Sequence, residues 1–480
     1  MFRTTRNWLV SASLLVFASP AVHAICYVDA AAAGANSGAS WADAYADLQS
    51  ALHDGACAET WVKRGVYKPT AGADPAVSFV IPSNFALYGG FAGTETLRTQ
   101  RDWKANPTIL SGDIDSNDQS VGGVAQSAAQ IVGTNTYTVV FIDQGQDYPV
   151  LDGFTVSAGN GGTRASQATG PNSGGGLYCH SWMAHCNATI RNVVFSGNRA
   201  EAYGGGLFVD ARDYSHLTIG DVSFIGNAAV IGGGGFANLN AQVDLDRVIF
   251  SGNSAAKGGA FYALALAQTK INQASFVGNS SPGHGGALYL DTSGTSSGGV
   301  FQVANATFQG NTSGDFGTVL YYNQNSPAVF KNVTISGNSG SGTVSLFYGT
   351  GGSLFFSNAI LWANPANVSV TLGSMSMTQS LMEGGCGAFV VMGSTACTST
   401  YSVDPLLNPL GNYGGAVPTM RLRSGSPAID TGNDSECATP LVGNVDARGV
   451  ARPQGAHCDI GAVEYGAGDD VLFANGFEAL

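Results

Sequence analysis

Charged residues are scarce in this chain: they make up 11% of its 480 residues, against about 25% in an average soluble domain. Hydrophobic residues nevertheless reach 44%. Intrinsic disorder requires low hydrophobicity together with high charge, so the composition excludes a disordered chain. With 67 glycines, the chain instead favours extended β-structure with many tight turns.

The chain also lacks a basic run beyond its first few residues, and its formal net charge is −13. Nucleic-acid binding depends on clustered Lys and Arg side chains that neutralise phosphates. We therefore expect no nucleic acid among the partners. The same acidity disfavours polyanionic substrates unless a cation mediates the contact.

No apolar run reaches the roughly 20 residues that cross a membrane as a helix. The N-terminus has Arg3 and Arg6, then the largely apolar segment 8–17, then a small-residue site that ends at Ala24. This order is typical of a signal peptide. We expect cleavage after residues 1–24, and a mature chain without a transmembrane segment that is extracellular or held at the outer-membrane surface.

No CxxC spacing occurs among the eight cysteines. In an exported protein, an even number of cysteines favours disulfides over metal sites. A zinc site that uses His180 and His185 is the alternative for the central pair of cysteines. Proximity along the chain predicts four disulfides: Cys26 with Cys57, Cys179 with Cys186, Cys386 with Cys397, and Cys437 with Cys458.

What the sequence does contain is an internal repeat. Five copies of Phe-x-Gly-Asn and two degenerate copies recur, and most precede a Gly cluster and then alternating apolar residues. The Asn-to-Asn steps are 26 to 32 residues, too short for the blades of a β-propeller, which need about 40. The copies begin at Phe195, Phe224, Phe250, Phe276, Phe308, Ile335 and Leu361.

We interpret each repeat as one coil of an all-β, right-handed parallel β-helix of the pectin-lyase-like kind. Side chains alternate in and out along a strand, so the Phe column is expected to stack inside the cylinder. The Asn column is expected at a turn. There, Asn tolerates a left-handed backbone, and its amide can bond the equivalent amide one coil away.

The ends of such a stack require caps, because they expose core and unpaired strand edges. We predict an N-terminal cap and first coils over residues 25–106, a repeat body over 107–369, a C-terminal cap over 370–465, and a linker and tail over 466–480. In the N-terminal cap, Ser40 and Asp43 predict the start of a helix and Gly55 its end.

Three segments carry a resemblance to known families. The paired Phe-x-Gly-Asn and Gly-Gly-Ala-Leu copies, over about residues 174–340, resemble the polymorphic outer membrane protein repeat. The segment from Tyr27 to Asp115 resembles the opening of exported pectin-lyase-like proteins. Residues from about 355 to 465, with Ser426-Pro427-Ala428-Ile429-Asp430, resemble the choice-of-anchor Q domain. These resemblances imply a surface or extracellular β-helix and bring no established catalytic residues.

Alignment of the Gly clusters predicts an outward aromatic column. If the preceding Leu and Phe positions point inward, the next position points outward, and rings about 4.8 Å apart would form an exposed ladder. Such a ladder is suited to binding carbohydrate or a partner surface; the alternative is self-stacking that shields the sheet. The ladder residues are Tyr178, Phe208, Tyr262, Tyr289 and Tyr321.

Candidate catalytic groups are sparse. Asp244 and Asp246 flank one strand residue and are expected to share a face, as the two carboxyl groups of a glycoside hydrolase must. Lys257, His284 and Asp315 precede Gly clusters in successive coils and could serve a lyase. Solvated turn residues are the alternative reading of these three, and neither set has the density of an active site.

A calcium loop is a further possibility at the start of the repeat body. Asp113, Asp115, Asn117 and Asp118 follow the spacing of such a loop, but the expected Gly at its sixth position is Asp118, and the Glu at its twelfth is Val124. A polar turn is the alternative. No other cofactor is indicated.

The sequence thus favours a secreted or cell-surface β-helix for adhesion or recognition, without catalysis, whose partner is a cell-surface glycan or protein. A polysaccharide lyase or glycoside hydrolase of the same fold is the alternative.

Overall fold

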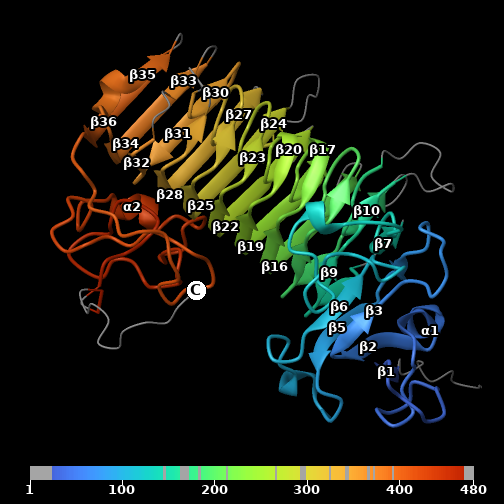
Figure 1. Cartoon of the computed structure of the whole chain (residues 1–480). Coiled ribbons are helices and arrows are strands. Elements are labelled where there is room, and N and C mark those ends of the chain that lie inside the picture. The colour runs from blue at the N-terminus through green and yellow to red at the C-terminus, as the bar shows by residue number, and fades with distance from the viewer. Residues whose placement is uncertain are drawn as a thin grey trace, which may run out of the picture.

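The computed structural model shows a solenoid of stacked parallel strands (Figure 1), so the expected right-handed parallel β-helix is confirmed. The expected signal peptide lies outside the described residues except for Ala24. The structure describes residues 24–143, 148–162, 172–181, 185–211, 215–264, 268–291, 299–323, 326–340, 345–364, 368–370, 373–391, 394–466 and 468–469.

Three sheets form the walls of the solenoid, and all pairs of neighbouring strands in them are parallel. Sheet 1 comprises β1 (Ala24–Val28), β2 (Cys57–Lys63), β3 (Gly65–Tyr67), β5 (Ala86–Phe91), β6 (Thr108–Ser111), β8 (Val150–Asp152), β9 (Thr155–Ser157), β12 (Thr189–Arg191), β13 (Val194–Ser196), β16 (His216–Ile225), β19 (Gln242–Ser251), β22 (Thr269–Val277), β25 (Phe301–Gln309), β28 (Ala328–Ser336), β31 (Ser353–Ser357), β32 (Ile360–Trp362), β34 (Ser374–Met382) and β36 (Thr395–Tyr401).

The other two sheets are shorter. Sheet 2 comprises β4 (Phe79–Ile81), β7 (Val140–Asp143), β11 (Leu177–Ser181), β15 (Leu207–Ala211), β18 (Phe236–Leu239), β21 (Phe261–Leu264), β24 (Leu288–Asp291), β27 (Leu320–Asn323), β30 (Phe347–Gly349), β33 (Val368–Val370) and β35 (Phe389–Val391). Sheet 3 comprises β10 (Asn160–Gly161), β14 (Arg199–Ala200), β17 (Ala228–Gly232), β20 (Ser254–Lys257), β23 (Ser280–Ser281), β26 (Thr312–Ser313) and β29 (Ser339–Gly340).

The predicted Phe column is one buried file. Its members pair in register from coil to coil, and the five Phe side chains are fully buried. The rings of Phe276 and Phe308 lie 4.5 Å apart with planes 1° from parallel, which is the closest pair of the file. The register runs through Phe195, Phe224, Phe250, Phe276, Phe308, Ile335 and Leu361.

The Asn column also forms a ladder, as predicted, but its backbone is not left-handed. The left-handed residue is the one before each Asn: a glycine, for example Gly252 with a φ of 64°, except in the last copy, where it is Ala363 with a φ of 55°. Glycine adopts this conformation without the steric cost that a side chain brings. The Asn residues are then free to turn their amides inward, where they bond one another.

A second left-handed corner divides each long strand of sheet 1 into two halves. It is occupied by non-glycine residues with φ near 50°, mostly polar ones that tolerate this region best. In the C-terminal half of the stack their amide side chains leave the sheet and bond another part of the chain. The corner residues from β16 onward are Asp221, Arg247, Gln273, Asn305, Asn332, Asn358, Gln379 and Ser399.

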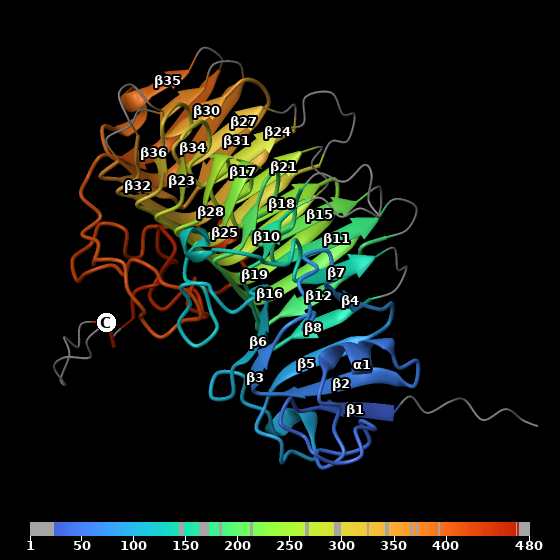
Figure 2. The same ribbon diagram turned by 45° about the vertical axis from the view of Figure 1, so that its right-hand side comes forward.

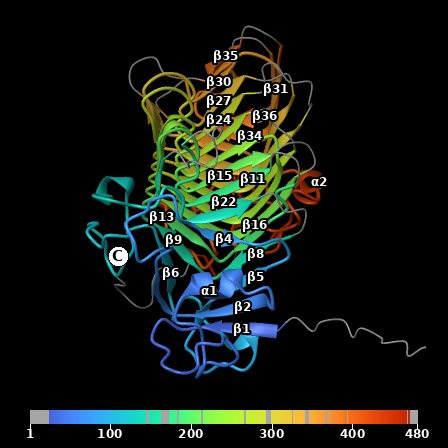
Figure 3. The same ribbon diagram turned by 90° about the vertical axis from the view of Figure 1, so that its right-hand side faces the viewer.

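The N-terminal helix is shorter than predicted. Helix α1 spans Leu48–His53, with Asp47 rather than Ser40 as its N-cap. Residues 40–46 form turns instead, because the backbone of Tyr45 pairs with Val28 at the edge of β1. Figure 3 shows α1 beside β2 at this end of the solenoid, where Leu48 and Leu52 bury their side chains in the core.

We expected residues 370–465 to cap the far end. The coils instead continue through β34 and β36. Residues 402–466, which include α2 (Asp434–Cys437), lie along the side of sheet 1, as Figures 1 and 2 show from two directions. We call residues 402–466 the C-terminal region. The end of the core is closed by the short helix η3 (Gly385–Ala388) and the disulfide between Cys386 and Cys397.

The C-terminal region is held by the corner side chains of five successive coils. For example, the Gln273 amide donates to the Asp446 carbonyl at 2.9 Å, and the Gln379 amide donates to the Thr431 carbonyl at 2.7 Å. Apolar contacts add to these bonds, since Ile360 of β32 packs with Ile460. The remaining short helices are η1 (Arg98–Gln100) and η2 (Ala128–Gln130).

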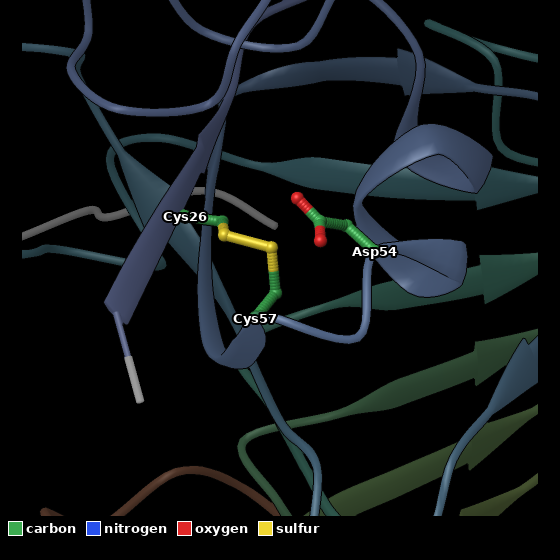
Figure 4. A group of neighbouring side chains, drawn as sticks. All are labelled: Cys26, Asp54 and Cys57. Carbon is green, nitrogen blue, oxygen red and sulfur yellow. A yellow bond between two sulfur atoms is a disulfide. The ribbon is translucent and has the colours of Figure 1, made fainter. Parts of the chain in front are cut away.

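All four predicted disulfides are confirmed. Figure 4 shows the bond between Cys26 and Cys57, with Asp54 beside it. These are the three residues whose possible metal-ligand atoms lie within 4.8 Å of one another, and no other such group occurs among the described residues. Both sulfurs are consumed by the disulfide, and Asp54 accepts a hydrogen bond from the Tyr45 hydroxyl at 2.5 Å, so these residues offer no metal site.

Within the described residues, no helix has the length and apolar character needed to cross a membrane.

Candidate functional site

The predicted aromatic column lies on the outer face of sheet 2, so the alternation was assigned correctly. Its rings form a cluster separate from the main core, while the preceding column, with Leu207 and Phe261, packs into that core. The column is longer at both ends than the sequence suggested. In register it runs through Phe141, Tyr178, Phe208, Ala237, Tyr262, Tyr289, Tyr321 and Tyr348.

Most of this ladder is not exposed, which corrects our expectation. Tyr178, Phe208, Tyr262 and Tyr289 expose 4% of their surface or less. Each ring is covered by its neighbours in the file and by the turns beside them: Tyr203 packs against Phe208 and Tyr262 at centroid distances of 6.0 and 5.3 Å. Self-stacking thus accounts for the buried part of the ladder, from Tyr178 to Tyr289.

The accessible rings lie towards the C-terminal end of sheet 2. Phe316 is 38% exposed and stacks on Tyr348 at 4.3 Å. The centre of the His284 ring lies 5.8 Å from that of Phe316 and 4.8 Å from that of Tyr321. Tyr321 and Tyr348 are half-buried. We call His284, Phe316, Tyr321 and Tyr348 the aromatic platform.

Phe316 and Tyr348 were missed in the sequence, although a signal existed. Phe316 directly precedes Gly317, as His284 precedes Gly285, and both glycines are left-handed. Tyr348 continues the ladder column beyond the last recognisable Gly cluster. Without that cluster the alignment ended one coil too early.

Polar groups line the next outward column beside the rings. The Thr350 hydroxyl donates to the Asn323 side-chain oxygen at 2.6 Å, and the Asn323 amide donates to the Asp291 carboxylate at 3.2 Å. Burial, followed by the nearby Asp291 charge, raises the pKa of the Tyr289 hydroxyl, which therefore remains a neutral donor. Rings and hydrogen-bonding groups are thus presented together on one face.

Lys257, His284 and Asp315 do converge at the edge of this face. The backbones of Lys257 and His284 pair as a bridge between adjacent coils. The His284 Nδ1 atom lies 3.5 Å from an Asp315 carboxylate oxygen, and the Lys257 ammonium lies 5.2 Å from the centre of the Tyr289 ring. Their catalytic role stays a prediction.

Asp244 and Asp246 share the outer face of β19, as predicted, with Leu245 buried between them. This face belongs to sheet 1, away from the aromatic platform. The Asp244 carboxylate lies 2.8 Å from His216 Nε2. Asp246 bonds Arg247. Burial raises the pKa of Asp246, and the Arg247 charge opposes that shift.

Arg247 in turn holds Asp221 through two hydrogen bonds of 2.7 and 2.8 Å. The carboxylates on this face are therefore engaged by other side chains of the protein: Asp221 and Asp246 by Arg247, and Asp244 by His216. A pair of carboxyl groups for glycoside hydrolysis needs one that can give up a proton and one that is unencumbered, so this geometry adds no support to hydrolysis.

The Asp113–Asp118 segment uses its carboxylates to fix a loop. Asp118 accepts from the Val132 backbone and the Asn135 amide, both at 2.7 Å. Asp115 accepts from the Thr134 backbone at 2.8 Å, and Asp113 accepts from the Asn117 backbone at 3.1 Å. Burial raises the pKa of Asp118. A calcium ion here stays a prediction.

Two segments, residues 192–210 and 247–264, match the profile of the Chlamydia polymorphic membrane protein repeat. Each match covers the same structural unit: the sheet 1 residues that lead into the Gly-Asn turn, that turn, a sheet 3 strand, the Gly cluster, and all or most of a sheet 2 strand. The chain is therefore similar to that repeat over these two segments. A search among curated proteins found no match.

Proposed function

We propose that this chain is an extracellular or surface-held recognition protein that binds glycan through the aromatic platform. The observation that carries the proposal is the accessible pair of Phe316 and Tyr348 beside a row of hydrogen-bonding side chains. A sugar ring has apolar C–H faces, which pack on aromatic rings, and hydroxyl groups, which need amide, hydroxyl or carboxylate partners.

The buried part of the ladder supports the platform mechanically. Tyr289 and Tyr321 stack at 4.7 Å with planes 3° apart, and Tyr262 continues the file below at 5.3 Å. Rings held in this way lose little conformational freedom when a ligand arrives. A preorganised surface binds more tightly than a mobile one with the same contacts.

The placement outside the cell rests on separate observations. Four disulfides favour an oxidising compartment, and the N-terminal residues 1–24 have the pattern of a signal peptide. Similarity to the polymorphic membrane protein repeat and the resemblance of residues 355–465 to the choice-of-anchor Q domain support the same placement, and with it a role in adhesion.

A glycan-array screen of the mature chain, residues 25–480, tests this function. The screen is read for retained protein and for chain cleavage. Binding without cleavage is expected. Release of reducing ends or unsaturated sugars would replace recognition with a lyase or hydrolase activity, for which Lys257, His284 and Asp315 would be the first residues to substitute.

Matched variants locate the binding face. Phe316→Ala and Tyr348→Ala should each weaken glycan binding by about tenfold, the usual cost of removing a stacking ring. Phe355→Ala is the control, because Phe355 is 40% exposed but lies on sheet 1. Equal binding by all three variants, or no binding to any glycan, would contradict the proposal.

A further inference from the structure

A pocket of about 360 Å³ lies between sheet 1 and the C-terminal region, on a different face from the aromatic platform. Three adjacent strands, β22, β25 and β28, supply its floor, and the segment that follows α2 supplies its wall. The lining residues are Lys270, Gln302, Lys331, Thr439, Pro440 and Leu441.

Fixed contacts hold the wall in place. The Lys331 ammonium lies 2.6 Å from the Glu436 carboxylate in α2. The Asn305 amide donates to the Val442 carbonyl at 3.1 Å, directly after the wall segment. The pocket is therefore formed by the docked C-terminal region and is not a gap between mobile parts.

Polar side chains near the pocket form hydrogen bonds or ion pairs with one another, but two of the lining side chains do not. His216 contacts Asp244, Asn272 contacts Asp246, and Lys331 contacts Glu436. Lys270 and Gln302, which are neighbours in register, make no side-chain hydrogen bond or ion pair with any residue that the structure describes.

The orientation of Lys270 adds to this observation. Its register neighbour Asp244 has a buried carboxylate oxygen, Oδ1, without a hydrogen-bond partner. Lys270 nevertheless makes no ion pair with that carboxylate, and it is one of the residues that line the pocket. Glu436 pairs with Lys331, so Lys270 is the cation of this pocket that has no ion pair with any residue that the structure describes.

We propose that this pocket binds a small organic carboxylate of about the size of one sugar ring. The Lys270 ammonium is a compact cation that pairs with a carboxylate. The Gln302 amide can donate to the same group or to a hydroxyl beside it. Pro440 and Leu441 give an apolar wall for the body of the ligand. The site is independent of the glycan site on sheet 2.

Titration calorimetry of the mature chain tests the pocket. Glucuronate and glucose form a matched pair of probes, because they differ only in the carboxylate that replaces a hydroxymethyl group. Glucuronate should bind, and glucose should show no binding up to about 10 mM. Equal binding of both sugars, or binding of inorganic phosphate as tight as that of glucuronate, would overturn the carboxylate assignment.

Variants tie the binding to the pocket. Lys270→Met keeps the length of the side chain and should weaken glucuronate binding about tenfold or more. Gln302→Ala, which removes no charge, should weaken it by a smaller factor. Lys104→Met, on the exposed surface of the N-terminal part, is the control and should bind as the unaltered chain does.

Thermal melting of each variant shows that the fold is kept. Glucuronate binding that Lys270→Met and Gln302→Ala both leave unchanged would overturn the proposal, as would no detectable glucuronate binding. Phe316→Ala should retain full glucuronate affinity at this pocket, so failure of the glycan proposal and failure of this one are distinguishable.

Discussion

The side-chain amide of Asn253 donates a hydrogen bond to the side-chain oxygen of Asn279, one coil away, at 2.9 Å. The same oxygen accepts from the Asn253 backbone at 3.0 Å, and the Asn253 amide also donates to the Phe224 carbonyl at 2.8 Å. Asn227 repeats this pattern towards Asn253. Each Asn therefore joins three consecutive coils in a place that water does not reach.

Asn253→Ala should lower the free energy of unfolding by about 3 kcal/mol, because it removes the buried acceptor of the Asn227 backbone and amide N–H groups and the buried donor to the Phe224 carbonyl. Chemical denaturation measures the loss. Ser254→Ala, one residue further in sheet 3 and only half-buried, should change stability little. Equal effects of the two substitutions would contradict a structural role for the ladder.

Two glycines with the same backbone conformation should respond differently to Ala. Gly252 and Gly258 both have φ near 60°, but an added Cβ at Gly252 meets nothing within 4 Å, whereas at Gly258 it would lie 2.2 Å from the Phe261 carbonyl oxygen. Gly252→Ala should cost about 1 kcal/mol from backbone strain alone, and Gly258→Ala clearly more. Melting temperatures that fall equally would contradict this distinction.

Stability should depend on pH through Asp459 in the C-terminal region. Burial raises the pKa of its carboxyl group to about 7, against the backbone hydrogen bonds from Tyr465 and Asp430 that favour the charged form. Between about pH 4 and pH 7 the folded chain keeps a proton that the unfolded chain has lost. Stability from this group is therefore highest at the acidic end and falls as the pH rises towards 7.

The raised pKa of Asp459 corresponds to a fall of about 4 kcal/mol in the free energy of unfolding between about pH 4 and about pH 7. Melting temperatures at about pH 5 and about pH 8 for the unaltered chain and for Asp459→Asn measure it. The difference between the two temperatures should shrink in the variant, whatever its absolute stability. An unchanged difference would show that other groups carry the pH dependence.

The attachment of the C-terminal region should depend on Asn358. Its side chain accepts from the Asn433 backbone at 2.8 Å and donates to the Asn433 carbonyl at 3.2 Å, and its own φ is 50°. Asn358→Gly keeps the backbone and removes the bonds. Limited proteolysis should then cut within residues 402–466 faster, while β-structure by circular dichroism stays the same.

Asn358→Ala serves as the companion variant. It removes the same two bonds and adds strain in the left-handed corner, so it should also lower the stability of the stack itself. If Asn358→Gly leaves the rate of proteolysis unchanged, the bonds of Asn358 are not needed for the attachment, and the other corner side chains and the apolar contacts around Ile360 suffice to hold the region.

The repeat could be predicted because its signal is local and periodic. Phe250 and Asn253 sit at fixed positions in a coil, and their neighbours in space are their copies in sequence. The disulfides followed from the same proximity. Helix α1 was predicted too long because the apolar spacing of residues 41–52 fits a helix. The same residues can also bury their side chains from turns and from one strand bridge at Tyr45.

The burial of the ladder and the place of the C-terminal region could not be predicted in this way. The in-and-out alternation along a strand predicts that the Tyr262 side chain points outward, but not what covers it. Tyr203, which covers it, lies two coils earlier in the chain. The corner residues Gln273 and Asn358 look like any exposed polar residues. Their partners lie more than 70 positions further along the chain, and no periodicity links them.

The docking of residues 402–466 has a consequence for how the molecule comes apart. In a solenoid, each coil contacts only its neighbours, so unfolding can begin at one end and proceed coil by coil along the stack. Here the C-terminal region is bonded to five coils, from Gln273 to Gln379. It must detach before the outermost of these five coils can unfold. The coils from β22 to β34 are therefore expected to unfold together with the detachment of the C-terminal region.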